Sequence, residues 1–241
     1  MNLWGLLMNI SNLDWKKDYK VFIDYLKSLA DADYQKLNER TGITEKSLGV
    51  RIPTLKKIAK EIYKGNYKDF IKYNKHNYYE EIILHGQVIG YIKDLDEAII
   101  ELNKFIPYIN SWASCDTTIA NFKIISKNLD KLYPLVISYL YDDNPWIKRV
   151  GLVILLNYYV CENYIDNIII EITKLELKDY YVKMACAWLI QVCYLKYPIK
   201  IIDFLRFDQI DDWTHNKAIQ KIRESLKVSQ KEKDKLNLLK R

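Results

Sequence analysis

Helical periodicity recurs along this chain almost without interruption, and it limits the possible folds more than any other feature. Large aromatic residues stand at the starts of successive expected helices, at Tyr79, Trp112, Trp146, Tyr181 and Trp213. The steps between them are 33, 34, 35 and 32 residues, and a second helix fits inside each step. A unit of this size buries its apolar face only by stacking on its neighbours, so the spacing predicts an α-α repeat.

The apolar periodicity also places the individual helices. We expect them at residues 15–30, 53–64, 67–74, 78–92, 95–107, 112–127, 129–140, 145–159, 163–175, 179–196 and 214–226. Pro53 suits a first helical turn, where its missing N–H costs nothing, and "DDNPWIKRV" offers Asn144 as a cap before Pro145. With only 7 Gly and 5 Pro in 241 residues, connections should be short. The predicted fold is all-α, a single curved α-solenoid of HEAT-like helical pairs.

No long linker divides the repeats. We expect an N-terminal extension at residues 1–14, one solenoid domain at 15–228 and a charged C-terminal tail at 229–241. The apolar start "MNLWGLLMNI" has no basic region and no small-residue cleavage site, and the longest apolar run, around "RVGLVILLNYYV", is too short to cross a bilayer. We therefore expect a cytoplasmic monomer that has no membrane partner.

Charge and cysteine content narrow the classes of function. The formal net charge of +6 permits a polyanionic partner without requiring one. The four cysteines form no CxxC pair and the three histidines lack zinc-ligand spacing, so we expect reduced thiols, no metal site and no cofactor. Cys186 and Cys193, seven apart in an apolar helix, should pack in the core. No phosphate-binding glycine loop is present and no nucleophile has a recognisable local setting, which sets those enzyme classes aside.

Four side chains share similar offsets within the repeats. Counted from the leading aromatic of each helix, Asp116 lies at plus four, Arg149 at plus three and Trp188 at plus seven, while Trp112 is itself a leading aromatic. At roughly 100° per residue, these offsets fall in one stripe about 100° wide on equivalent helices. Stacking therefore predicts that Trp112, Asp116, Arg149 and Trp188 lie on one side of the solenoid, where such folds bind their ligands.

Each of these residues also has an ordinary structural explanation. Trp146 is expected in the core, and the apolar setting "MACAWLIQVC" makes packing the first explanation for Trp188. Asp116 could cap or pair locally, and Arg149 could bridge to an acidic neighbour. An acid, a base and two indoles that face one groove are nevertheless less ordinary than any one of these features alone.

With these residues in place, the sequence resembles the HEAT-like-repeat DNA alkylation repair glycosylases, the AlkD-like proteins. The similar segments are "LGVRIPTLKKIAKEI", "WASCD", "NPWIKRVGLVILL", "YYVKMACAWLI" and "HNKAIQKIRES", in this order across roughly residues 30–226. The resemblance implies an α-solenoid whose concave, basic face holds duplex DNA. It also implies excision of N3- or N7-alkylated purines without a base-flipping pocket.

The resemblance further implies roles for single residues. Trp112 and Trp188 match the indoles that embrace the sugar of the damaged nucleotide, Asp116 matches the catalytic carboxylate, and Arg149 matches the arginine near the backbone of the lesion. Gln191 stands where typical active members carry an arginine that anchors phosphate. The segment "KLNERTGITEKSLG" stands where the family places a DNA-recognition loop.

Two alternatives accompany this hypothesis. Lys148 and Lys183, near the same helix starts, are candidates for contacts to the DNA backbone, and plain solvated lysines are the equal alternative. The alternative function is a non-catalytic HEAT-like module that binds DNA or a protein partner. Such a module would bind without turnover and would be indifferent to Asp116→Asn, whereas a glycosylase would depend on Asp116.

Overall fold

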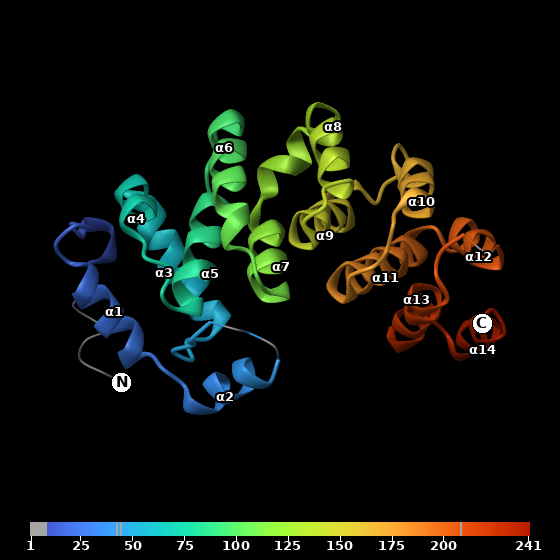
Figure 1. The fold of residues 1–241 in the computed structure, drawn as a ribbon, viewed down its shortest axis with the longest axis horizontal. Coiled ribbons are helices and arrows are strands. Elements are labelled where there is room, and N and C mark those ends of the chain that lie inside the picture. Colours follow the sequence, from blue (N-terminus) through green and yellow to red (C-terminus); the bar gives the residue numbers. More distant parts are fainter. Residues whose placement is uncertain (1–8, 42, 44, 208) are drawn as a thin grey trace. The chain divides into compact units, whose positions relative to one another are not determined.

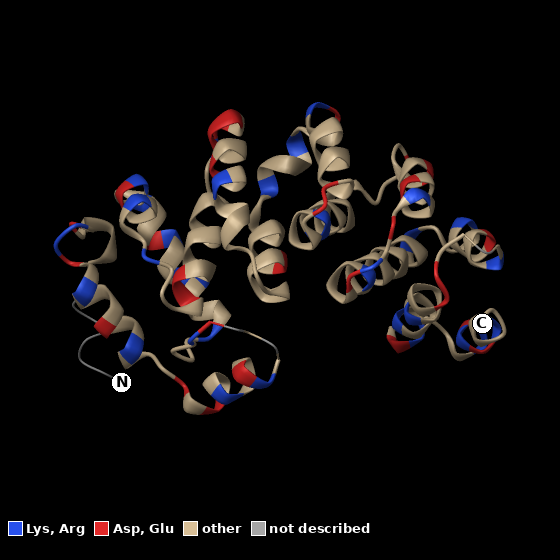
Figure 2. Ribbon diagram, in the orientation of Figure 1, with Lys and Arg blue, Asp and Glu red and all other residues tan. Residues whose placement is uncertain are grey.

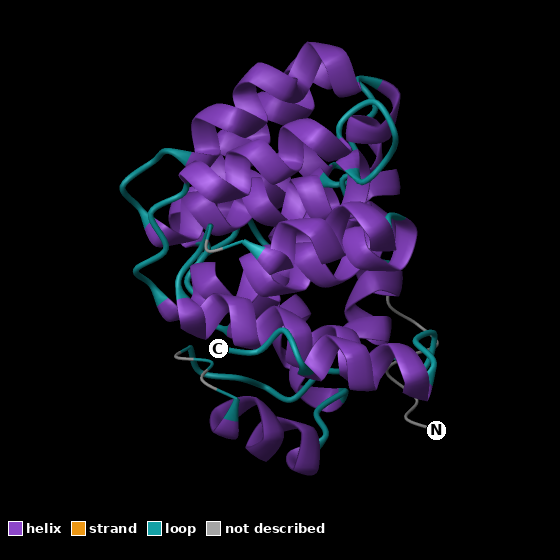
Figure 3. Ribbon diagram, turned by 90° about the vertical axis from the view of Figure 1, so that its right-hand side faces the viewer, coloured by secondary structure: helices purple, strands orange, loops and turns teal. Residues whose placement is uncertain are grey.

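The computed structural model describes residues 9–41, 43, 45–207 and 209–241. In this part of the chain every regular element is helical and no strand occurs, which confirms the all-α class (Figure 3). The helices fall into two compact units, one that reaches to Ile124 and one that starts at Ile125 (Figure 1). The single domain over residues 15–228 stays a prediction, and each unit is described by itself.

In the residues that the structure describes, the first unit contains seven α-helices. They are α1 (Tyr19–Ser28), α2 (Ala32–Arg40), α3 (Ile52–Lys64), α4 (Tyr67–Tyr73), α5 (Tyr79–Ile89), α6 (Leu95–Phe105) and α7 (Trp112–Asn121). Short 3-10 turns are η2 (Ile10–Asn12) and η3 (Ile106–Tyr108), and η4 (Lys123–Lys127) spans the boundary between the units. Helix α3 begins one residue before Pro53, as the proline predicts.

Helices α3, α5 and α7 stack side by side in this unit, while α4 and α6 alternate with them along the chain. This is the α-α repeat that the aromatic spacing predicts. As the middle helix, α5 is buried along its whole length. A Cβ on its Gly86 would lie 1.9 Å from Oγ1 of Thr118 on α7, so the absence of a side chain lets the two helices approach closely.

The hydrophobic core of the first unit extends to the residues ahead of α1. Trp15, Phe22 and Phe70 meet edge to face, with ring centroids 4.9–6.3 Å apart. Such edge-to-face pairs contribute about 0.5–1.5 kcal/mol each beyond the burial of their area. Trp15 is therefore packed against α1 and α4 and belongs to the core of this unit.

The second unit contains the remaining helices. They are α8 (Leu129–Leu140), α9 (Pro145–Ile154), α10 (Ile165–Lys174), α11 (Tyr180–Lys196), α12 (Pro198–Arg206), α13 (Asp212–Glu224) and α14 (Gln230–Asn237), with a π-helical turn, η5 (Leu155–Tyr159), directly after α9. Asn144 caps α9 through a 2.8 Å bond from the N–H of Trp146, and Pro145 is the first helical residue, as expected.

The second unit repeats the same stacking. Helix α11 lies between α9 and α13, and α12 packs against α11. Cys186 and Cys193 are buried on α11 without a disulfide, which confirms their expected place in the core. Burial raises the pKa of both thiols, that of Cys193 to about 12, so neither is poised as a nucleophile.

The charged segment at residues 229–241 is helical over most of its length. Ser229 and Glu232 form a capping box at the start of α14, which satisfies the exposed N–H groups there. Helix α14 packs on α13, and Leu236 is buried. The imidazole of His215 on α13 lies 2.7 Å from the carbonyl oxygen of Leu239, which ties the end of the segment to the repeat.

None of the helices in the described residues is long and apolar enough to cross a membrane.

Candidate functional site

Helix α7 carries the two residues expected at the centre of the site. Ser111 caps it: its hydroxyl accepts the Ser114 N–H at 3.2 Å, and the Ser114 hydroxyl accepts the Ser111 N–H at 3.3 Å. This capping box fixes the start of the helix at Trp112. Trp112 and Asp116 therefore lie one turn apart on one continuous helix.

The buried side chain of Gln87 on α5 holds α7 in register. Its Nε2 donates to the Thr117 carbonyl oxygen at 2.7 Å, and its backbone carbonyl accepts from Nδ2 of Asn121 at 2.8 Å. These two hydrogen bonds lie one turn apart on α7. Together with the close approach at Gly86, they restrict sliding and rotation of α7 relative to α5. The direction in which Trp112 and Asp116 point is thus set by the packing of α5.

Trp112 is exposed to solvent, and a hydrogen bond also fixes the orientation of its ring. Its side chain is 39% exposed, which is unusual for a tryptophan, while its Nε1 donates to the carbonyl oxygen of Thr41 at 3.2 Å. Thr41 directly follows α2. Asp116 is half-buried and is the only charged residue of α7 (Figure 2). An indole face and a single carboxylate therefore stand together on an otherwise uncharged helix.

The segment that follows Thr41 is anchored by a residue that sequence reasoning missed. The fully buried carboxylate of Glu80, on α5, accepts four hydrogen bonds of 2.8–3.2 Å, from the Ser47 hydroxyl and from the N–H groups of Leu48, Gly49 and Val50. Residues 47–50 form no helix, so their buried N–H groups have no helical partners, and the carboxylate of Glu80 supplies the acceptors instead. The sequence feature that could have indicated a buried, bonded carboxylate is the pair of consecutive acids at the start of the apolar stretch "YYEEIILHGQVI".

Gly49 permits the turn that this anchor requires. Its φ is +86°, a left-handed conformation that a side chain would strain, and a Cβ there would lie 2.4 Å from the carbonyl oxygen of Asp31. Asp31 caps α2 and binds Arg51 at 2.6 Å, so both ends of residues 31–51 are held. The region in which the resemblance places a DNA-recognition loop therefore has a defined anchor on α5.

In the second unit Arg149 lies at the junction of α9 and α11. It is 4% exposed, and its Nη1 donates to the carbonyl oxygen of Tyr181 at 2.6 Å. One partner of Arg149 is thus a backbone carbonyl in the first turn of α11. A hydrogen bond from a buried charged group of this kind contributes about 1.5–3 kcal/mol. Direct contact of Arg149 with a phosphate stays a prediction.

The other expected site residues of this unit lie on α9 and α11. Trp188 and Gln191 are half-buried on α11, and Lys148 is half-buried on α9. Lys183 pairs with Asp211 at 3.0 Å. Burial would raise the pKa of Asp211, but hydrogen bonds from Thr214 and Lys183 hold it below its usual range. Lys183 is thus partly neutralised by its partner.

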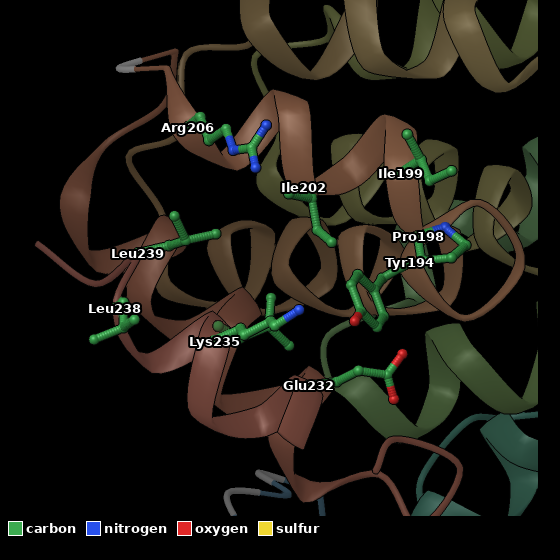
Figure 4. Close-up of a pocket in the computed structure, with 10 residues that line it drawn as sticks. Tyr194, Pro198, Ile199, Ile202, Arg206, Glu232, Lys235, Leu238 and Leu239 are labelled. Carbon is green, nitrogen blue, oxygen red and sulfur yellow. The ribbon is translucent and has the colours of Figure 1, made fainter. Parts of the chain in front are cut away.

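Trp112 and Asp116 belong to the first unit, whereas Arg149 and Trp188 belong to the second. Each pair is therefore placed within its own unit, and the convergence of all four on one face stays a prediction. Among the described residues, one cavity of 580 Å³ is lined by α11, α12 and α14 (Figure 4), and another of 320 Å³ lies beside α4 and α6. Neither contains an expected site residue. Among the described residues no group of three or more His, Cys, Asp or Glu is arranged to hold a metal ion.

Comparison with known proteins assigns the family. A family model described as DNA alkylation repair enzyme matches residues 22–225, from within α1 to just past the end of α13. A comparison with curated proteins finds no match. The matched range contains Trp112, Asp116, Arg149 and Trp188 and covers most of the sequence. This chain belongs to the DNA alkylation repair enzyme family.

Proposed function

We propose that this protein is a DNA glycosylase that hydrolyses the N-glycosidic bond of cationic N3- or N7-alkylpurines in duplex DNA without flipping the base. Membership of a DNA alkylation repair family supports a DNA substrate and an enzymatic role. One observation carries the proposal: the carboxylate of Asp116 lies one turn from the exposed indole of Trp112, on a helix that has no other charge.

The chemistry requires one carboxylate and no general acid. Alkylation at N3 or N7 makes the purine cationic, so when the bond to C1′ breaks the base keeps the electron pair and departs neutral. The deoxyribose then gains oxocarbenium character. A carboxylate fixed beside C1′ stabilises that positive charge and orients the water whose oxygen bonds to C1′, and the proton of this water is released to the carboxylate or to solvent.

The hydrogen bond of Trp112 supports its role beside the sugar. Because the Thr41 carbonyl accepts the indole N–H, the ring is oriented before the substrate arrives. The face of an indole attracts a cationic sugar by about 0.5–2 kcal/mol. In this proposal Trp188 supplies the second indole, from the other unit, and Arg149 together with Lys148 lies near the backbone of the lesion.

The test is the release of 7-methylguanine from duplex DNA at low salt. The wild type should release the base, and Asp116→Asn, which keeps the size and one acceptor oxygen of the side chain but loses the charge, should reduce release by at least about 100-fold. Asp24→Asn is a matched control, because Asp24 is an exposed aspartate of the first unit that forms an ion pair with Lys27 one turn away. It should retain full activity.

DNA binding separates the alternatives. If the wild type binds duplex DNA but neither it nor Asp116→Asn releases base, the protein is a non-catalytic binding module. If both proteins release base at equal rates, Asp116 is not the catalytic carboxylate and the proposed mechanism is wrong.

A further inference from the structure

The aromatic residues that recur at helix starts form a continuous row in the second unit. Trp146 stacks on Tyr181 with ring centroids 5.0 Å apart and an interplanar angle of 29°. Tyr181 meets Tyr180 edge to face at 5.3 Å, and Tyr180 meets Trp213 edge to face at 5.7 Å. The row thus crosses from α9 through α11 to α13, which are neighbours in the fold (Figure 1).

The row arises from the repeat itself. Trp146, Tyr181 and Trp213 each stand two residues after the cap of their helix, where the caps are Asn144, Asp179 and Asp211. Equivalent positions on stacked helices lie along the stacking direction, so the row runs from repeat to repeat. A ligand that matches such a row is itself a linear polymer with a regular repeat.

These rings are not buried as core residues would be. Tyr180 is 56% exposed and Trp213 is 39% exposed. Trp146, expected in the core from the sequence, is only half-buried, as is Tyr181. Neighbouring aromatic rings that leave this much surface in contact with solvent are typical of surfaces that bind a ligand or a partner.

Cations stand beside the exposed end of the row. Nζ of Lys217 lies 5.6 Å from the ring centroid of Trp213, and Nζ of Lys183 lies 6.0 Å from it. Asp142 and Asp143 precede the cap of α9 at the other end of the row. Three acids lie at the starts of α11 and α13, and each of these three is already bonded. Asp179 accepts from N–H groups of the first turn of α11, Asp211 binds Lys183 at 3.0 Å, and Asp212 binds Arg241 at 3.4 Å.

We propose that Trp146, Tyr181, Tyr180 and Trp213 form a stacking platform for the unpaired bases of a single DNA strand, whose phosphates contact Lys183 and Lys217. Every base has a flat aromatic face, and every nucleotide of the strand contributes one phosphate. Rings in a row with ammonium groups beside them therefore complement a strand whatever its sequence. This site goes beyond the proposed excision activity and does not depend on it, because unmodified bases would bind there.

The test is the affinity of the full-length protein for a fluorescently labelled oligothymidine of about 12 nucleotides, measured by anisotropy. The strand contains no purine, so base release plays no part in the result. Tyr180→Leu and Trp213→Leu should each weaken binding about tenfold, because leucine keeps apolar bulk but removes the ring. Tyr180→Phe and Trp213→Phe keep a ring and should remain within about threefold of the wild type.

Tyr141→Leu is the matched control. Tyr141 is 50% exposed in the same unit but is absent from the row, so its loss should leave the affinity unchanged. The proposal is overturned if the wild type does not bind the oligothymidine, or if the leucine variants at Tyr180 and Trp213 bind as tightly as the wild type. It is also overturned if the leucine and phenylalanine variants weaken binding equally, since ring stacking would then not be the cause.

Discussion

Glu80→Gln should release the segment that contains residues 47–50. In the wild type, Oε1 accepts from the Ser47 hydroxyl and from the N–H groups of Gly49 and Val50, while Oε2 accepts from the N–H of Leu48. Glutamine has one carbonyl oxygen and an NH₂ group that cannot accept. The variant therefore loses the negative charge and leaves at least one buried backbone donor without an acceptor.

The size of the effect follows from these four bonds. A buried donor left unsatisfied costs about 1–3 kcal/mol, and the remaining bonds lose the strengthening that comes from charge, so the total should be about 3 kcal/mol. Each 1.4 kcal/mol corresponds to a factor of ten, and exchange of the amide protons of Leu48, Gly49 and Val50 should therefore accelerate by about 100-fold.

Native-state hydrogen exchange measures this directly at the three amides. Glu61→Gln is the control, because Glu61 lies on α3 with its side chain 43% exposed and pairs with Lys64 one turn away, an arrangement worth about 0–1 kcal/mol. Unchanged exchange at Leu48, Gly49 and Val50 in a folded Glu80→Gln protein would refute the anchoring role of this carboxylate.

Three further changes have equally definite outcomes. Gly86→Ala places a methyl group against Oγ1 of Thr118 and should lower the free energy of unfolding, measured by urea titration, by about 1–3 kcal/mol. Adding Thr118→Ala to this variant should recover part of the loss. An unchanged free energy of unfolding in Gly86→Ala would contradict the close approach of α5 and α7. Burial lowers the pKa of His76 from 6.5 to about 4. Burial and the charge of His76 lower the pKa of His85 from 6.5 to about 3. Because the unfolded chain takes up protons at higher pH than the folded one, the free energy of unfolding should fall as the pH drops from 6.5 towards 4. The variant His76→Asn, whose asparagine tolerates the φ of +53°, should reduce this dependence, and an unaltered pH profile would count against the assignment. Gln191→Arg should tighten binding to duplex DNA and steepen the slope of log affinity against log salt by about 0.9, and an identical slope would show that no phosphate contact was added.

Helix positions could be predicted where a proline or a cap marks the start and an apolar stripe follows. Helices α3 and α9 begin at or beside the prolines that predict them. Helix α2 was missed because "ADYQKLNER" has few apolar residues and no clear stripe. Helices α12 and α14 were missed although Pro198 and the pair Ser229 and Glu232 are ordinary start signals, because a short or highly charged helix gives little periodicity.

The candidate site was predictable only in part. Spacing and resemblance together selected Trp112 and Asp116, which the structure places one turn apart on α7. No local pattern indicates that Trp112 donates to Thr41 or that Glu80 binds residues 47–50, because these contacts join segments 30 or more residues apart. The burial of Arg149 against Tyr181 likewise depends on how α9 and α11 pack, which periodicity alone does not determine.

The most direct test of the account is the single-turnover rate constant for 7-methylguanine release from duplex DNA, with protein in excess, for the wild type and Asp116→Asn. The account expects measurable release by the wild type and a rate constant at least about 100-fold lower for the variant, with DNA affinity unchanged within about threefold. Equal rate constants for the two proteins would contradict the central role of Asp116.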